Sequence, residues 1–312
     1  MTPPEVSVIL PAFNRLAYLR DAIGSVLAQT HTDWELIIAD DGSDEETRSF
    51  LETIGDERVI VLLLRHSANP AVVRNAALRR ARGVYVAFLD SDDVWAPRKL
   101  EVQLALMRSH PGRRWSYTNM VMTDAAGGPW AHARARAWVL YDGCVVKPLL
   151  EFAANIPTAS VVAERTLVDE VGGFDEEQLF GEDCDLWLRC ALASEVSVSP
   201  EKLVYIRDHD VARYSRDRVA EHHGWVRLFG KMAALVPHAA LRSVCLRRRG
   251  EVSLVLAGLY FERGDHLSTG RTLLSAARYS WRFPKWWWGA AKATLRPVVP
   301  TRILSTYRRL RA

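Results

Sequence analysis

The chain has 312 residues, of which 49% are hydrophobic and 25% charged, as in a soluble globular protein with one large or two smaller domains. Its four cysteines form no Cys-x-x-Cys pair, which argues against a zinc cluster or a disulfide framework. No apolar run reaches the roughly 18 residues of a membrane span, and the start Met-Thr-Pro-Pro-Glu lacks the basic and apolar regions of a signal peptide, so we expect a cytoplasmic protein.

Charge is distributed unevenly along the chain. From Leu241 to the end there are 15 Lys and Arg against 3 Asp and Glu, whereas the preceding residues hold 26 and 34. A basic tail is typical of contact with an anionic surface, and a solvated basic helical face is the alternative. We therefore expect two regions, residues 1–215 and a basic helical region at 216–312.

Strand and helix patterns alternate over the first hundred residues. A short apolar strand is predicted at Val6–Leu10, broken by Pro11-Ala12-Phe13-Asn14, and apolar residues then recur at helical spacing. The next predicted elements are strands at Trp34–Ala39 and Val59–Leu64, a turn at Asp40–Asp44 where Ser43 or Asp44 caps a helix, and a helix at Pro70–Arg82 that Gly83 ends.

A buried strand predicted at Val84–Leu89 stops at Asp90, Asp92 and Asp93. Carboxylates this close repel one another unless a cation or a hydrogen-bond donor shares the site. Mg²⁺ is usually held by one or two carboxylates and substrate phosphates, so the pattern indicates a metal–diphosphate site. The structural alternative is an acidic loop in which Ser91 or Asp93 caps a helix that Pro97 begins.

The alternation predicts a parallel α/β sheet with covering helices. Ligands bind such sheets beyond the carboxyl ends of the strands. Three polar breaks lie there, at residues 11–14, 40–44 and 90–93, and we expect them to meet along one edge as a nucleotide site. No Gly-x-Gly-x-x-Gly follows the first strand, which disfavours a dinucleotide fold.

Beyond the helix expected at Pro97–Ser109 the pattern is less regular. We predict a strand at Trp115–Met122, a mobile loop near the active site at Ala131–Arg136, and strands at Val161–Ala163 and Leu203–Ile206. Glu182 and Asp183 begin a further helix, where the helix dipole favours carboxylates and simple capping would explain them. His209 follows a strand, which is the main reason to consider it beyond a structural or solvated role.

Five segments in this order together resemble the family 2 glycosyltransferases, which have a GT-A fold. They are Val-Ser-Val-Ile-Leu-Pro-Ala-Phe-Asn from Val6, Asp-Asp-Gly-Ser from Asp40, Phe-Leu-Asp-Ser-Asp-Asp from Phe88, Gly-Gly-Phe-Asp-Glu from Gly172 and Glu-Asp-Cys-Asp-Leu-Trp-Leu-Arg from Glu182. The resemblance runs from Val6 to about Ser215 and implies an α/β, Rossmann-like nucleotide-diphospho-sugar transferase sheet with flanking helices, followed by a helical C-terminal region. One departure is Asn69-Pro70-Ala71, where the family often has Asn-x-Gly.

The resemblance also implies roles for individual residues. Asp183 matches the catalytic base, with Glu182 and Trp187 near the acceptor, and Asp92 matches the ligand of Mn²⁺ or Mg²⁺. His209 matches a closing loop and is a second candidate metal ligand. The nucleotide-sugar side is implied to comprise Pro11, Ala12, Phe13, Asp41, Arg74, Asp90 and Ser91.

The implied reaction moves a sugar, with inversion, from a nucleotide-sugar, usually a UDP-sugar, to a hydroxyl of a saccharide or lipid-linked acceptor in cell-surface polysaccharide synthesis. A metal ion and Arg74 would stabilise the leaving diphosphate, and Asp183 would take the acceptor's proton. Two alternatives stay open. A sugar nucleotidyltransferase would want a Gly-rich basic loop after the first strand, and a non-catalytic nucleotide-sugar-binding scaffold would not need Asp183.

The C-terminal third is helical in pattern. Apolar-periodic segments at Val252–Glu262 and Thr269–Arg278 flank Gly264 and predict a helical hairpin. The Trp281–Trp288 run mixes aromatics with Arg and Lys, which suits peripheral contact with an anionic inner membrane face. Aromatic packing against the catalytic domain is the structural alternative, and a nucleic-acid surface is disfavoured because no binding motif accompanies the charge.

Overall fold

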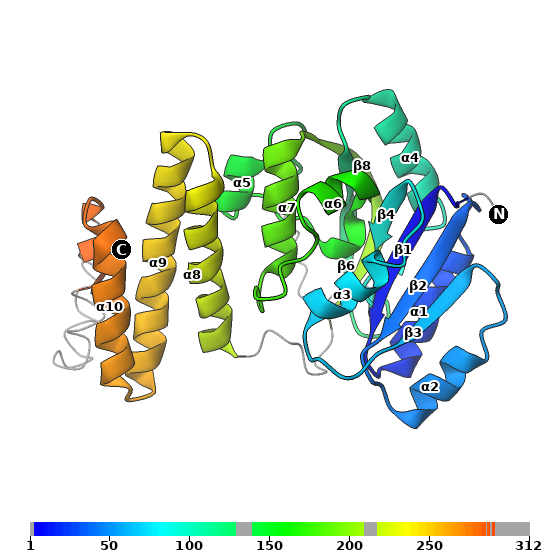
Figure 1. The fold of residues 1–312 in the computed structure, drawn as a ribbon, viewed down its shortest axis with the longest axis horizontal. Helices are drawn as coiled ribbons and strands as arrows, with labels where there is room; N and C mark the ends of the chain where they lie inside the picture. The colour runs from blue at the N-terminus through cyan, green and yellow to red at the C-terminus, as the bar shows by residue number, and fades with distance from the viewer. Residues whose placement is uncertain (1–2, 129–138, 209–216, 285, 288, 291–312) are drawn as a thin grey trace. The chain divides into compact units, whose positions relative to one another are not determined.

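A computed structural model of the chain describes residues 3–128, 139–208, 217–284, 286–287 and 289–290, and these contain one eight-stranded sheet. His209 and the loop expected at Ala131–Arg136 lie outside the described residues. Contacts divide the chain into two units, a sheet unit within residues 1–213 and a helical unit within residues 214–312 (Figure 1).

The sheet order is β3-β2-β1-β4-β7-β6-β8-β5. The strands are β1 (Val6–Ala12), β2 (Trp34–Asp40), β3 (Val59–Leu63), β4 (Tyr85–Phe88), β5 (Val94–Trp95), β6 (Trp115–Thr123), β7 (Val162–Glu164) and β8 (Val196–Arg207). The helices of the sheet unit are α1 (Leu16–Leu27), α2 (Glu45–Glu52), α3 (Pro70–Leu78), α4 (Lys99–Ser109), α5 (Val146–Leu150), the 3₁₀ turn η1 (Thr158–Ser160), α6 (Arg165–Glu170) and α7 (Glu182–Ala193).

The sheet is mixed. β3, β2, β1 and β4 run parallel to one another, and β6 and β8 pair in parallel, but β7 is antiparallel to both β4 and β6, and β5 is antiparallel to β8. The parallel pairing expected from the strand–helix alternation is therefore confirmed for β1 to β4, and the antiparallel pairs involve strands that come later in the chain. The strand–helix alternation that predicts parallel pairing stops after α4, so the pattern no longer determines strand direction.

The expectation that the first strand breaks at Pro11 is wrong, because β1 continues through Pro11 and Ala12. Pro11 lies opposite Ala39 of β2, whereas β4 pairs with β1 only as far as Ile9. Where β1 has one paired neighbour, a proline without an N–H is tolerated. Pro11 therefore extends the strand that carries Phe13 toward the site.

Other boundaries differ for tertiary reasons. Helix α3 ends at Leu78 with Arg79 as its C-cap, so Gly83 does not cap it. Gly83 instead allows a close approach to β1, since a Cβ there would lie 2.6 Å from the backbone nitrogen of Ser7. Asp93 does not cap α4, which begins at Lys99, because its carboxylate accepts the N–H of Arg207 at 3.2 Å. Asp44 does cap α2, accepting the N–H of Thr47 at 2.9 Å.

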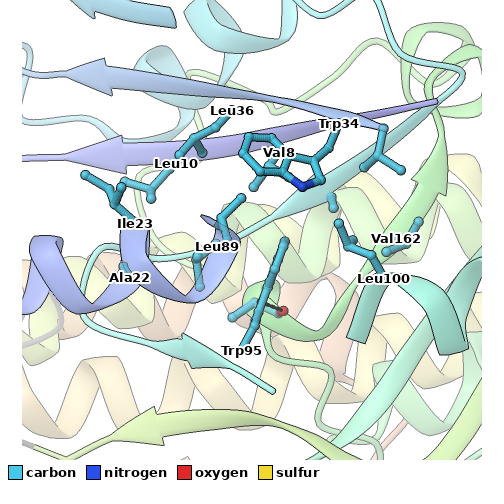
Figure 2. Close-up of a cluster of buried hydrophobic side chains, with 14 of the residues drawn as sticks. Val8, Leu10, Ala22, Ile23, Trp34, Leu36, Leu89, Trp95, Leu100 and Val162 are labelled. Atoms are coloured by element: carbon cyan, nitrogen blue, oxygen red, sulfur yellow. Dashed lines mark hydrogen bonds between the residues drawn. The ribbon is translucent and has the colours of Figure 1, made fainter. Parts of the chain in front are cut away.

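Two apolar layers cover the sheet. On one face, alternate side chains of β1 such as Val8 and Leu10 pack with Ile23 of α1 and Leu100 of α4, and Figure 2 shows Trp95 pointing into this layer. On the other face, Phe88 of β4 contacts Phe174 and Trp187 edge-on. The sheet is therefore held rigidly from both sides, while its carboxyl ends carry the polar loops.

The helical unit contains α8 (Arg218–Leu235), α9 (Ala239–Glu262) and α10 (His266–Ser280), which lie side by side in Figure 1 with α9 in the middle. Gly264, at a φ of +78°, makes the turn between α9 and α10, so the predicted helical hairpin is present. Within the described part of the chain, no helix has the length and apolar character needed to cross a bilayer.

Candidate active site

Arg74 lies at the centre of a charged cluster where β4 ends and α7 begins. Its Nη2 donates to Asp90 Oδ1 at 2.7 Å, and its Nη1 donates to Glu182 Oε1 at 2.9 Å. The side chain projects from α3, whose first turn is set by Pro70 and by the side chain of Asn69, which accepts the N–H of Ala71. One guanidinium thus joins the two acidic motifs, which are far apart in the sequence.

Burial makes the charges of this cluster interdependent. Arg74 is only 6% exposed, and although burial lowers its pKa, Asp90 and Glu182 outweigh burial and keep the guanidinium protonated. Burial raises the pKa of Asp90 against the opposing effect of Arg74, and Asp92 raises it further. Burial, followed by repulsion from Asp183, raises the pKa of Glu182 to about 7, while Arg74 acts in the opposite direction.

Asp183 stands in the first turn of α7, beside this cluster. Thr158 Oγ1 donates to Asp183 Oδ2 at 3.2 Å, and the N–H of Cys184 donates to Oδ1 at 2.7 Å. Asp183 does not cap the helix in the usual sense, because Gly181 occupies the cap position. Each carboxylate oxygen therefore has one neutral donor and a remaining lone pair with which to accept a proton.

Asp41 follows β2 and is 4% exposed. Its Oδ1 accepts from the N–H and the hydroxyl of Ser67 at 2.8 and 2.9 Å, and its Oδ2 accepts from the N–H of Ala68 at 3.0 Å. His66 Nδ1 lies 2.8 Å from the Asp41 carbonyl oxygen. His66 Nδ1 also lies 3.1 Å from Asp41 Oδ2, so Asp41 organises the loop after β3.

Phe13 and His66 form a stacked aromatic pair next to Asp41. Their ring centroids are 4.4 Å apart with an interplanar angle of 19°, and 43% of Phe13 is exposed. An exposed aromatic surface beside a buried carboxylate can hold the face of a planar base. Of the other predicted donor-side residues, Ala12 is buried in β1, and Pro11 and Ser91 are half-buried.

Asp92 and Arg15 connect the ends of β4 and β1. Arg15 Nη1 donates to Asp92 Oδ2 at 2.9 Å, and Arg15 is held at a φ of +59° before α1. Left-handed backbone costs a non-glycine residue roughly 1–2 kcal/mol, so surrounding contacts must maintain it. The N–H of Asn14 donates to the hydroxyl of Ser43, which ties the same loop to the end of β2.

These residues fit a divalent cation that shares its ligands with a substrate. No group of three or more His, Cys, Asp and Glu gathers within the described ranges as it would at an all-protein metal site. Asp90 and Asp92 nevertheless supply two carboxylates at one strand end, and Asp92 raises the pKa of Asp90 through repulsion that a cation would relieve. Mg²⁺ is commonly held in this way, by one or two carboxylates and phosphate oxygens.

Trp187, expected on the acceptor side, is buried among aromatic side chains. It is 1% exposed and stacks on Trp115 at a centroid distance of 6.0 Å, with Phe88 and Phe174 at its edges. It lies on α7 one turn beyond Asp183, on the face that packs against the sheet. Trp187 therefore fixes the position of α7 from the interior.

Several site residues escaped the sequence reasoning. His66 and Ser67 follow β3, whose carboxyl end had no acidic motif, and Thr158 lies in a 3₁₀ turn without a recognisable pattern. Arg15 directly follows the first polar break, and only its ion pair with Asp92 distinguishes it. A rule that examines every residue after a strand end would have found His66 and Ser67 but not Thr158.

Comparison with known proteins identifies the same regions. A family model described as glycosyl transferase family 2 matches residues 7–130, and one described as glycosyl transferase family group 2 matches residues 85–249. The putative teichuronic acid biosynthesis glycosyltransferase TuaG of Bacillus subtilis is 51% identical over 128 residues, which are 40% of this chain and 50% of TuaG.

A second relative is UDP-Glc:alpha-D-GlcNAc-diphosphoundecaprenol beta-1,3-glucosyltransferase WfgD of Escherichia coli, 41% identical over 102 residues, or 33% of this chain and 40% of WfgD. The match thus spans half or less of the length of each of these two relatives.

Two solved structures have a similar fold. TarS 1–349 of S. aureus, in complex with UDP-GlcNAc, superposes with a TM-score of 0.63 at 16% identity, covering 88% of this chain and 92% of TarS 1–349. The mannosyltransferase PcManGT of Pyrobaculum calidifontis, in complex with GDP-Man and Mn²⁺, gives a TM-score of 0.58 at 18% identity, with coverages of 98% and 84%.

Proposed function

Because this chain belongs to the family 2 glycosyltransferases and has the GT-A fold, we propose that it transfers a sugar from a nucleotide-sugar to a hydroxyl of a saccharide or lipid-linked acceptor in cell-surface polysaccharide synthesis. The observation that carries the proposal is the position of Arg74 between Asp90 and Glu182. The side chain of Arg74 thus bridges the motif at Asp90, expected at the donor diphosphate, and the motif at Glu182, expected at the acceptor hydroxyl.

The donor would lie along the carboxyl ends of β1, β2 and β4. Its base would stack on Phe13 beside His66, with Asp41 accepting a hydrogen bond from the base edge. We propose a UDP-sugar, since WfgD is described as using UDP-Glc and TarS 1–349 binds UDP-GlcNAc, whereas PcManGT binds GDP-Man. Pro11, Ala12 and Ser91 would shape the ribose side of this groove.

A Mn²⁺ or Mg²⁺ ion held by Asp90 and Asp92 with the donor phosphates would neutralise the charge that the leaving diphosphate gathers. Arg15 at Asp92 and Arg74 at Asp90 already place cations at these carboxylates. Binding of the donor would then redistribute those ion pairs, so that Arg74 turns part of its hydrogen bonding toward the diphosphate. His209 would contribute as a second metal ligand.

Asp183 would act as the base. Its lone pairs not used by Thr158 and Cys184 would accept the proton of the acceptor hydroxyl as the oxygen attacks the anomeric carbon. The attack comes from the face opposite the leaving diphosphate and inverts the anomeric centre, so no carboxylate nucleophile is needed. Glu182 would stand on the acceptor side and hold Arg74.

The test is donor hydrolysis and binding. The chain incubated with a panel of nucleotide sugars and Mn²⁺ should slowly hydrolyse one donor in preference to the others. Calorimetry with UDP and Mn²⁺ should show metal-dependent binding that Asp92→Ala abolishes while the fold is retained. Unchanged UDP affinity of Asp92→Ala in Mn²⁺ would remove Asp92 from the metal site.

Two other functions are less well supported. A sugar nucleotidyltransferase needs a loop that binds a triphosphate, but Pro11 and Ala12 belong to β1 and Phe13 after it stacks on His66. A binding scaffold would have no use for a carboxylate at Asp183 with open lone pairs. For the basic C-terminal region we propose peripheral contact with the anionic inner face of the cell membrane, where a lipid-linked acceptor would be found.

A further inference from the structure

One face of α10 carries exposed leucines and arginines in alternation. Leu267, Leu274 and Trp281 are 65%, 74% and 58% exposed, and Arg271 and Arg278 are exposed between them. The spacings of four, three, four and three residues place all five on one side of the helix. We refer to these five residues as the outer face of α10.

The opposite side of α10 is fully used in packing on α9. Thr269, Ala276 and Ser280 are buried there, and a Cβ on Gly250 of α9 would lie 2.2 Å from Ser280 Oγ. Ser253 and Tyr279 also join their hydroxyls at 2.9 Å across this contact. Close packing of small residues thus fixes the rotation of α10 about its axis. Because of this rotation, the outer face points away from α9.

The cations of the outer face form no close ion pair with a residue that the structure describes, although Arg271 interacts electrostatically with Asp265 at the start of α10. By contrast, Arg247 and Arg248 on α9 both pair with Glu251. The described part of the helical unit holds 11 Lys and Arg against 5 Asp and Glu. The outer face therefore combines exposed apolar side chains with positive charge that is not neutralised within the unit.

We propose that the outer face of α10 is the surface by which the chain docks on an anionic lipid bilayer. This inference rests on the membrane contact proposed above and assigns it to α10. Leu267, Leu274 and Trp281 would enter the interface between headgroups and acyl chains, and Arg271 and Arg278 would meet lipid phosphates. Arg282 stacks on the ring of Trp281 at 4.9 Å and extends the cationic edge.

This assignment changes the part played by the tryptophan run. Trp286 is 5% exposed and donates to the Gly250 carbonyl at 3.2 Å, so it belongs to the interior of the helical unit. A second copy of the chain is a poorer partner for the outer face, since a two-fold contact would bring arginines against arginines. The leucines likewise argue against nucleic acid, which offers no apolar layer of this kind.

The experiment uses the full chain with vesicles of phosphatidylcholine alone or with phosphatidylglycerol. Wild type should float with the anionic vesicles, and high salt should weaken this binding. Leu267→Gln with Leu274→Gln should reduce binding by about 10-fold or more. Arg271→Gln with Arg278→Gln should reduce it by about 30-fold, from about 1 kcal/mol per cation near an anionic surface.

Matched controls use exposed residues away from the outer face. Leu235→Gln with Val255→Gln removes two exposed apolar side chains, and Arg218→Gln with Arg263→Gln removes the same charge.

Wild-type binding by the outer-face variants, or equal loss in the controls, overturns the assignment to α10. Absence of binding by wild type overturns membrane contact itself, and a dimer that dissociates in the leucine variant identifies a second copy instead. UDP binding in each variant reports separately on fold and donor site.

Discussion

The two units of the chain treat charge in opposite ways. Every buried charged side chain that the structure describes belongs to the sheet unit, namely Glu35, Asp40, Asp41, Arg74, Asp93, Lys99, Asp185 and Arg207. The buried polar residues described in the helical unit are Ser253, Thr269 and Ser280. Its arginines lie toward the surface, and those on α10 form no ion pair with a described residue.

This difference separates two uses of charge. Burying a charge costs desolvation free energy unless partners compensate it. Buried charges that lie near one another are therefore typical of sites where the position and reactivity of each group matter. Exposed cations cost little and act at a distance through their field. The sheet unit thus holds its buried charges at defined positions, whereas the helical unit presents its cations toward the solvent.

The largest effect is expected from Asp183→Asn, which keeps the size of the side chain and most of its hydrogen bonding. Asn cannot take a proton from the acceptor, so sugar transfer should fall by about 10²–10⁴-fold. UDP binding should stay near wild type, because Asp41, Arg74 and Asp92 remain. The control is Asp169→Asn, the same change at an exposed carboxylate of α6.

Two outcomes would contradict this role of Asp183. Transfer near the wild-type rate would remove Asp183 from the role of base. Loss of both transfer and UDP binding would indicate that Asp183 mainly maintains the structure around Thr158.

Arg74→Met should cause the next largest effect, on stability. Without the guanidinium, Asp90 and Glu182 share a buried site with no cation, and breaking such an arrangement costs about 3–5 kcal/mol. Arg271→Met on the outer face of α10 should leave the free energy of unfolding nearly unchanged. Urea denaturation of both variants measures the contrast, and equal losses would mean that the two units do not differ as described.

The pKa of Glu182 predicts a dependence of stability on pH. Its value of about 7 lies above the usual carboxyl value of 4.5, so the folded chain binds the proton more tightly than the unfolded chain. The associated stability is complete below about pH 4.5 and is lost as pH rises to about 7, by up to roughly 3 kcal/mol. Glu182→Gln, which resembles the protonated form, should lack this loss.

Urea denaturation of wild type and Glu182→Gln at pH 5 and pH 8 provides the measurement. The difference in unfolding free energy between the two proteins should shift in favour of the variant at the higher pH. A constant difference at both pH values would show that Arg74 keeps Glu182 ionised throughout, with the ion pair stronger than the effect of burial.

The smallest effect is expected at the aromatic surface near Asp41. Phe13→Ala removes one ring of the stacked pair, and loss of one base–aromatic stack costs about 1–3 kcal/mol. The dissociation constant for UDP should rise about 10-fold while the stability of the fold changes little, since 43% of Phe13 is exposed. Calorimetry checks this, and an unchanged constant would place the base elsewhere along the strand ends.

Local patterns in the sequence were sufficient for much of this protein. Apolar runs and turn residues predicted β1 to β4 in nearly the observed places, since a short buried strand and its polar end are encoded by neighbouring residues. The motifs at Asp40, Asp90 and Glu182 carried the resemblance to the family 2 glycosyltransferases, and the two family models now match across them. Helical periodicity likewise predicted the α9–α10 hairpin.

Only the tertiary structure decided which distant groups meet. Nothing near Arg74 in sequence indicates that it joins Asp90 to Glu182, or that Trp187 is fully buried while Asp183, one turn earlier on the same helix, is only half-buried. The direction of β7 and the inward turn of Trp286 depend on partners far along the chain. Local sequence specifies periodicity and capping within a few residues, whereas burial and pairing depend on the packing of the whole unit, which no short stretch encodes.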